Sequence, residues 1–377
     1  MINTQIIAHY EDWWNKKNNK PPLYAIYPKK GKSFHGAVKP WMGKQLVKEW
    51  SNWKQEMIFG QAVELAWKTG EHHYIDDTVA FYEEYLDTTG HDAQGFSFLL
   101  PGVGPGVLSA FITDFTKFNG DTIWFELEKP WSFEKLQQIT LDSRSFYADV
   151  AIQAVKELVS RLKGKFVFAP PDLAGPLDIL SSIRTGYNLL LDTMDYAEEL
   201  LEVVERVEKL WRSYFAELSA IIDPVNDGLY TNVFRYLSSK PMHTCICDFS
   251  AMISPSMFEE LVLPTVMRDA EQFDGRLIYH LDGPGEIVHV DALCRVEKLH
   301  SIQWVPGAGN DHGAAESWFP LFKKILEGGK RICLTGYPSD PEALKPLFKA
   351  FPKEEFVLSS TFKSEEDCLQ FINVLNL

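Results

Sequence analysis

The sequence is poor in cysteine, in long apolar runs and in positive charge. It has only five cysteines in 377 residues, an odd and small number that argues against a disulfide framework and for a reducing compartment. No apolar stretch approaches the roughly 20 residues of a membrane-spanning helix, and no basic segment followed by an apolar run marks a signal peptide. The net charge of -15 argues against a nucleic-acid-binding surface, which needs clustered basic residues. We therefore expect a cytoplasmic protein without membrane or nucleic-acid partners.

The composition is that of an ordered globular protein. Hydrophobic residues make up 45% of the chain and charged residues 24%, close to globular averages. No linker rich in Gly, Ser or Pro divides the sequence, so we expect a single domain over 1–377 with an N-terminal helix within 1–20. That helix is predicted over 4–16, with Thr4 as its cap and Tyr10, Trp13 and Trp14 near one face.

The last hundred residues repeat a strand followed by a helix. The predicted strands are 276–281, 299–304, 331–335 and 355–359, and predicted helices follow at 314–328, 340–351 and 364–375. Such units require parallel strands with crossover helices. Earlier strands are predicted at 23–27, 95–100, 165–170, 228–236 and 242–247, and helices at 44–69 and 134–162. A helix-rich section is predicted over 177–222, with the clearest helical period over 196–218. A closed (β/α)₈ barrel, an α/β fold of the TIM type, is the favoured architecture, and an open doubly wound sheet is the alternative.

In such a barrel the C-terminal strand ends line the pocket. The residues expected there mix carboxylates, one imidazole, hydroxyls and aromatic rings, a set that suits a polar or aromatic small molecule. The candidates for substrate binding are Tyr27, Asp172, Gln303, Trp304, Tyr337 and Ser360. The candidates for catalysis are Asp248, His280 and Asp282.

His280 and Asp282 lie two positions apart, just before the turn Gly283-Pro284-Gly285. Their side chains therefore share one strand face. They are predicted to ligate a metal ion together, or to act as an acid/base pair in which the carboxylate tunes the imidazole.

A second group of metal-ligand types occurs in the segment 243–248. Period-two alternation places His243, Cys245 and Cys247 on one face, with Asp248 on the other unless the strand ends there. These three could supply zinc, or one of them, Cys247 in our assignment, could join His280 and Asp282. The competing interpretation is that the cysteines are ordinary buried core residues.

Two further polar segments are interpreted as structural. His72 and His73 are expected in a solvated loop or helix end. The glycine-rich run 101–106 has neither a Walker nor a dinucleotide spacing, and Pro105 removes a backbone N–H, so we expect a structural loop.

With the strand ends placed, the chain resembles the uroporphyrinogen decarboxylase superfamily. The resemblance covers most of the chain and rests on motifs in order: Pro-Pro-Leu-Tyr at 21–24, Gly-Pro-Gly-Val-Leu at 104–108, Gly-Pro-Leu-Asp at 175–178, the segment 247–255, and His-Leu-Asp-Gly at 280–283. It implies a single (β/α)₈ barrel. Members include the haem-pathway decarboxylase and cobalamin-dependent methyltransferases that act on methylated corrinoid proteins.

The departures from the family patterns favour the methyltransferase branch. The decarboxylase branch carries an arginine-rich signature after its first strand, where this chain has Lys29 and Lys30, and a lysine does not replace a bidentate arginine. Its essential aspartate falls near Phe98, and its late histidine near Ser359. The methyltransferase branch uses His-x-Cys-Gly, with a later cysteine, to hold zinc that activates a thiol. Here Asp282 stands in place of the first cysteine and Ser360 near the second.

The resemblance implies an enzyme that moves a methyl group with a corrinoid or cobalamin partner, with zinc as a cofactor. The alternative is a decarboxylase that acts on a porphyrinogen or a smaller carboxylate and uses Lys29 and Lys30. A second alternative is a non-catalytic barrel that binds a ligand. A homodimer is compatible with each.

Overall fold

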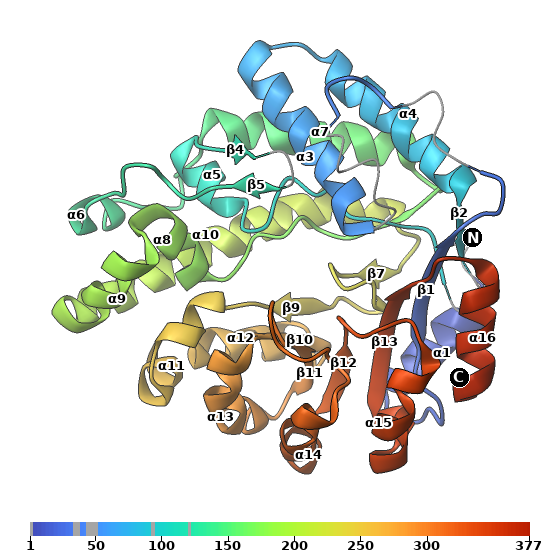
Figure 1. Ribbon diagram of the computed structural model, residues 1–377. Coiled ribbons are helices and arrows are strands. Elements are labelled where there is room, and N and C mark those ends of the chain that lie inside the picture. The colour runs from blue at the N-terminus through green and yellow to red at the C-terminus, as the bar shows by residue number, and fades with distance from the viewer. Residues whose placement is uncertain (1–2, 33–37, 43–51, 92–94, 120–121) are drawn as a thin grey trace. The chain divides into compact units, whose positions relative to one another are not determined.

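A computed structural model describes residues 3–32, 38–42, 52–91, 95–119 and 122–377. Its internal contacts divide the chain into two compact units, each built from discontinuous segments (Figure 1). The first unit comprises Met1–Lys32, Thr88–Ser97 and Gly228–Leu377, and the second comprises Ser33–Asp87 and Phe98–Asp227. No helix among the described residues is long and apolar enough to cross a membrane.

A seven-stranded sheet is the centre of the first unit. Its strand order is β2-β1-β13-β12-β11-β10-β9, and every neighbouring pair is parallel except β1 with β2. The strands are β1 (Leu23–Pro28), β2 (Thr89–His91), β9 (His243–Cys245), β10 (Leu277–Asp282), β11 (Leu299–Val305), β12 (Arg331–Leu334) and β13 (Phe356–Thr361). Most of their residues are buried, as expected for a parallel sheet covered on its faces.

The repeated strand–helix units of the last hundred residues are confirmed. The helices that follow the strands are α13 (Val290–Cys294), α14 (Phe319–Glu327), α15 (Lys345–Ala350) and α16 (Glu365–Leu375). Both α14 and α15 begin later than predicted, because a proline occupies the first helical turn of each and fixes where the helix starts. Upstream of these units the first unit contains α11 (Pro255–Leu261) and α12 (Leu263–Gln272).

The N-terminal helix α1 (Thr4–Trp14) is confirmed, but the predicted cap is wrong. Asn3 is the cap, and its side chain accepts a hydrogen bond from Gln5 N at 2.9 Å. Tyr10, Trp13 and Trp14 are buried, as the helical period predicts.

The second unit is mostly helical. It contains α3 (Asn52–Thr69), α4 (His73–Thr88, which ends at the boundary), α5 (Leu108–Thr113), α6 (Phe133–Leu136), α7 (Phe146–Leu162), α8 (Pro176–Arg184), α9 (Gly186–Asp195) and α10 (Ala197–Ile222). The predicted helix over 134–162 is interrupted between α6 and α7. Ser145 begins α7 as its cap, and its hydroxyl also donates to Ala110 O at 2.8 Å. Residues 43–51 of the predicted helix 44–69 lie outside the described residues.

The early strands are shorter than predicted. In the second unit β3 (Phe98–Leu99) pairs in parallel with β6 (Val167–Phe168). The side-chain amide of Asn226 bonds both the N–H and the C=O of Phe168, at 2.9 and 2.8 Å. A side chain thus satisfies backbone groups that a further strand would otherwise bond.

The predicted strand over 228–236 is also corrected. It holds only β7 (Tyr230–Thr231), which pairs antiparallel with β8 (Leu237–Ser238) outside the seven-stranded sheet. Arg235 turns the chain back with a φ of 66°. The fold is therefore mixed α/β with a mostly parallel central sheet, and closure into an eight-stranded barrel within one domain stays a prediction.

Candidate functional site

His280 and Asp282 lie at the C-terminal end of β10. Both are partly exposed, whereas Tyr279, which precedes His280, and Leu281, which lies between the two, are buried. The alternation along the strand therefore puts His280 and Asp282 on one face, as predicted. Gly283 then takes a φ of 88°, a backbone conformation that L side chains rarely adopt. The chain turns at once into a 3-10 segment, Pro284–His289, which ends the strand with its polar face open.

Asp248 joins this pair from another part of the chain. It begins the 3-10 segment Asp248–Met252, which follows β9 at the same edge of the sheet. Nε2 of His280 lies 4.0 Å from Oδ1 of Asp248 and 3.9 Å from Oδ2 of Asp282. One ligand atom from each residue lies within 4.8 Å of the others. We call these three residues the Asp-His-Asp cluster.

Gln303 fixes the protonation of His280. It lies opposite His280 in the register of β10 and β11, is fully buried, and its Oε1 bonds Nδ1 of the imidazole. Its Nε2 donates to Trp304 O at 3.4 Å and lies 2.7 Å from Thr335 Oγ1. A carbonyl oxygen can only accept, so this amide end is the NH₂ and Oε1 faces the imidazole. Nδ1 therefore carries a proton, and Nε2 faces the two carboxylates.

The electrostatics of the cluster favour a cation. Desolvation by the surrounding protein raises the pKa of Asp248, His280 opposes the rise, and the negative charge of Asp282 adds to it. Because 61% of the Asp248 side chain is exposed, water keeps access to this carboxyl. The proximity of Asp282 is therefore the better-supported cause of the raised pKa of Asp248, because two neighbouring carboxylates repel each other whether or not they are buried. A bound cation relieves that repulsion.

Several other predicted pocket residues lie at strand ends of the first unit. Tyr27 is buried, and its hydroxyl donates to His91 O at 3.3 Å. Burial raises the pKa of Tyr337, an effect that the Ser360 hydroxyl opposes. The predicted roles of these residues in substrate binding stay predictions.

Trp304 lies on the other face of β11. Its neighbour Gln303 faces His280, so alternation turns Trp304 away. It is fully buried and packs edge-on against Trp318, with ring centroids 5.0 Å apart. The structure does not bring it to the Asp-His-Asp cluster.

Two predicted residues have local roles that are now visible. Asp172 belongs to the second unit, where its Oδ1 accepts from Ala174 N at 2.8 Å and its C=O accepts from Val107 N at 3.1 Å. Cys247 is buried directly before Asp248. The ligand groups that converge within the described part of the chain do not include Cys247, and Asp248 occupies the place predicted for it.

His243 and Cys245 belong to a different group. Strand β9 ends at Cys245, so the predicted alternation does not extend to Cys247. The third member is instead Asp269 of α12, whose Oδ2 accepts from Cys245 Sγ at 3.1 Å. Cys245 and Asp269 are buried where β9 packs against α12.

The polar segment around His72 forms a surface ion-pair network in the second unit. Arg161 bonds Asp76 at 2.5 Å and Glu157 at 3.0 Å, while His72 bonds Glu157 at 2.7 Å. The Arg161 guanidinium already neutralises these carboxylates, so the cluster supports the structural interpretation of His72 and His73. His73 is the first residue of α4.

Two contributors to the site were missed in the sequence. Thr335 orients the amide of Gln303, and the ring of Phe234 lies 5.2 Å from that of His280. Gln303 was assigned to substrate binding rather than to orienting His280. The sequence did contain a signal for this contact. Gln303 lies two residues before the end of β11, as His280 does in β10, and adjacent parallel strands that end together place such residues opposite each other.

The comparisons with known proteins support the fold alone. No family model matches the chain, and no curated protein matches it. Its fold is similar to the solved structure of a methyltransferase from Methanosarcina mazei, with a TM-score of 0.54. That similarity covers 98% of this chain and 98% of that chain at 8% sequence identity.

Proposed function

We propose that this protein is an enzyme that transfers a methyl group, with the Asp-His-Asp cluster as its metal centre. The convergence of Asp248, His280 and Asp282 at one strand edge carries the proposal. The likeness in fold to a methyltransferase over nearly the whole chain agrees with it.

The donor set fits a divalent cation. Gln303 holds the proton of His280 on Nδ1, which leaves Nε2 as a ligand, and the two carboxylates offer oxygen atoms. Imidazole and carboxylate together suit zinc and harder transition metals, whereas a thiolate site is softer. A metal ion bound there would act as a Lewis acid toward the group that accepts the methyl.

The residues of the chain supply the remaining requirements. The carboxylates of Asp248 and Asp282 neutralise the cation and, being 61% and 39% exposed, leave room beside it for a substrate atom. His280 is only 13% exposed and is held by Gln303, so its ligand atom is pre-oriented. We propose a methylated corrinoid, carried by a partner protein or free as cobalamin, as the methyl donor.

The test measures metal binding and methyl transfer in the same preparations. Wild type and the variants His280→Ala and Asp282→Asn are incubated with Zn²⁺ or Co²⁺, desalted and analysed for metal. Demethylation of methylcobalamin is then followed spectrophotometrically with a thiol acceptor. We expect one metal ion per chain and thiol-dependent demethylation in wild type, and loss of both in the variants. His73→Ala, which removes an exposed histidine far along the sequence, is the control.

Three outcomes contradict the proposal. If the wild-type protein binds no metal and does not demethylate methylcobalamin, the proposed metal-dependent methyl transfer is wrong. Turnover of a porphyrinogen that depends on Lys29 favours the decarboxylase alternative instead. Ligand binding that survives replacement of both His280 and Asp282, without any turnover, favours the non-catalytic alternative.

A further inference from the structure

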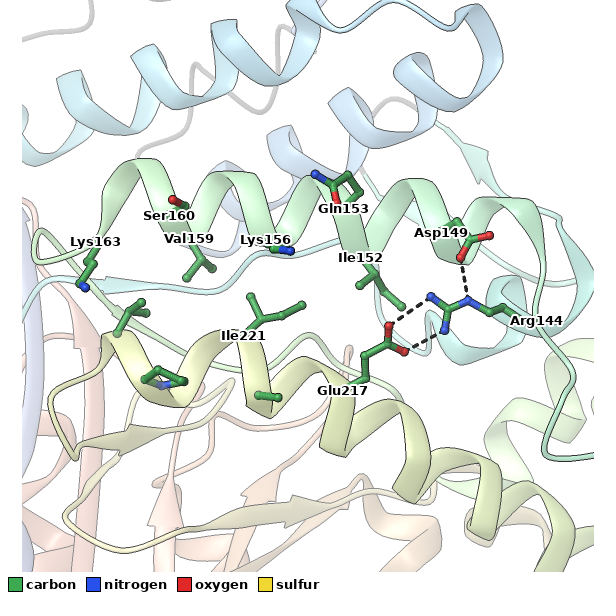
Figure 2. A pocket seen from close by; sticks show the side chains of 13 residues that line it. Arg144, Asp149, Ile152, Gln153, Lys156, Val159, Ser160, Lys163, Glu217 and Ile221 are labelled. Carbon is green, nitrogen blue, oxygen red and sulfur yellow. Dashed lines mark hydrogen bonds and ion pairs between the residues drawn. The ribbon is translucent and has the colours of Figure 1, made fainter.

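The surface of the second unit carries a groove between α7 and α10 with a volume of about 830 Å³ (Figure 2). Figure 2 shows side chains of both helices directed into it. The lining residues are Arg144, Asp149, Ile152, Gln153, Lys156, Val159, Ser160, Lys163, Glu217, Ala220, Ile221, Pro224 and Val225.

The floor of the groove is apolar. Ile152 and Val159 are seven residues apart on α7 and almost fully buried, and Ile221 and Val225 are half-buried four residues apart. The spacing of Ile152 and Val159 places them on one face of α7, whereas Val225 belongs to the 3-10 segment Asp223–Val225 that follows α10. The apolar surface open to a ligand therefore comes mainly from the segment 220–225, with Ile152 and Val159 packed beneath it.

The ionic groups at one end of the groove are internally paired. Arg144 binds Asp149 at 2.7 Å and Glu217 at 2.8 and 3.1 Å, as Figure 2 shows. Its bidentate contact with Glu217 satisfies both carboxylate oxygens. With one cation and two carboxylates this end carries a net charge of −1, so it does not attract an acidic ligand.

The α7 side of the groove also carries unpaired positive charge. Lys156 on α7 and Lys163, the cap residue that follows Leu162, are exposed, with Ser160 between them in the sequence. Neither ammonium has a hydrogen-bond or ion-pair partner among the residues that the structure describes. In a chain of net charge -15, this is a local positive wall beside an apolar floor.

The groove has the length of a short helix. From Asp149 to Leu162 it follows α7, a separation of 13 residues that is about 20 Å at about 1.5 Å per residue. A partner helix of about four turns would lie along it. Its apolar residues at i, i+4 and i+7 would meet the floor, and acidic residues at its flank would meet Lys156 and Lys163.

We propose that the α7–α10 groove binds an acidic amphipathic helix of a partner protein. Apolar contacts hold the helix, and the two lysines select a negatively charged flank. This inference does not depend on methyl transfer, because the groove and the Asp-His-Asp cluster share no residue.

The probe is a fluorescent helical peptide of about 14 residues, with leucines at the contact positions and glutamates on one flank. We expect it to bind the full chain with an affinity that falls as salt rises. Lys156→Glu/Lys163→Glu should weaken binding about tenfold or more, since two attractions become repulsions. The control Lys209→Glu/Lys323→Glu makes the same charge change at exposed lysines outside the groove. Melting curves establish that all variants are folded.

The remaining outcomes overturn the proposal. These are absence of peptide binding, or equal affinity in wild type and the groove variant. Equal binding of a scrambled glutamate peptide shows a site for polyanions rather than for a helix. Self-association of the free protein that the groove variant abolishes assigns the groove to a second copy of the chain.

Discussion

Nδ1 of His280 donates a hydrogen bond to Oε1 of Gln303, the residue directly opposite it on the neighbouring parallel strand. This pair orients the strand edge, because it occupies Nδ1 and leaves Nε2 of the imidazole facing two carboxylates. If the proposed metal binds, Nε2 is the nitrogen that is positioned as its ligand.

Replacing Gln303 with leucine should weaken metal binding without removing a ligand. The imidazole loses its fixed tautomer and orientation, and we expect affinity for Zn²⁺ or Co²⁺ to fall about 10- to 100-fold. Gln303→Glu keeps an acceptor oxygen and should restore much of the loss. Isothermal titration measures both. Ser301→Ala, two residues earlier on β11 and also fully buried, is the control. Unchanged affinity in the leucine variant would contradict a positioning role.

Asp282→Cys should soften the metal site. A thiolate beside His280 favours zinc over harder cations, so we expect tighter Zn²⁺ binding relative to Mn²⁺ in competition titrations. With Co²⁺ the variant should show thiolate-to-cobalt charge-transfer absorption that wild type lacks. Asp291→Cys places a thiol on α13 away from the cluster and should show neither effect. Absence of the new absorption would mean that residue 282 does not ligate the metal.

The ion pair between Glu11 and Arg276 should contribute strongly to stability. Arg276 Nη1 and Nη2 bond the two carboxylate oxygens of Glu11 at 3.0 and 2.7 Å, and the arginine side chain is only 6% exposed. Arg276→Met leaves the Glu11 carboxylate without its ion-pair partner, and we expect a loss of about 3 kcal/mol in the free energy of unfolding. Urea denaturation measures it. A double-mutant cycle with Glu11→Gln should show that the two losses are not additive.

The same pair predicts acid sensitivity. Burial raises the pKa of Glu11, but the bonds from Arg276 and Ser239 outweigh it and hold the pKa below its ordinary value. The stabilisation is therefore present above about pH 4.3, the usual value for glutamate, and is lost as the pH falls through the folded-state pKa. Glu11→Gln should flatten the stability profile in this range. An unchanged slope there would contradict the assignment.

His300 should make the protein less stable in mild acid. Its ring lies 4.5 Å from that of Trp13 and 4.6 Å from that of Trp14, and its Nε2 bonds Trp14 O at 3.1 Å. Burial, with a smaller contribution from Arg331, holds its pKa well below the ordinary value. Below about pH 6.5 the unfolded chain binds a proton that the folded chain does not, so stability falls by up to about 1.4 kcal/mol per pH unit.

The measurement compares urea unfolding of wild type and of His300→Gln between about pH 7.5 and about pH 5. The glutamine side chain keeps a hydrogen-bond donor at this position. The variant should be less stable at pH 7.5 because the tryptophan packing loosens, yet its stability should depend less on pH. A parallel pH dependence in both proteins would show that His300 does not titrate on unfolding. Burial also lowers the pKa of His91, to about 4. His91→Gln should therefore reduce the pH dependence of stability over the same pH range, independently of His300.

Elements whose signals are local could be predicted from the amino-acid sequence. Alternation and helical period identified β1, β10 to β13, α1, α10 and the repeated strand–helix units, because each signal is contained within about ten residues. The same locality placed His280 and Asp282 on one face of β10, since residues two apart on a strand necessarily share a face.

Which distant residues contact one another depends on how the folded segments pack. Asp248 rather than Cys247 reaches His280, because β9 ends at Cys245 and a 3-10 turn redirects the following side chains. Gln303 became the partner of His280 through the register between two strands, and Trp304 was turned away by the same alternation. The short strands β3 and β6 and the break before α7 depend on Asn226 and Ser145, whose bonds reach 58 and 35 residues along the chain. Such contacts leave no local pattern in the sequence, because their energy exists only after the distant segments have packed together.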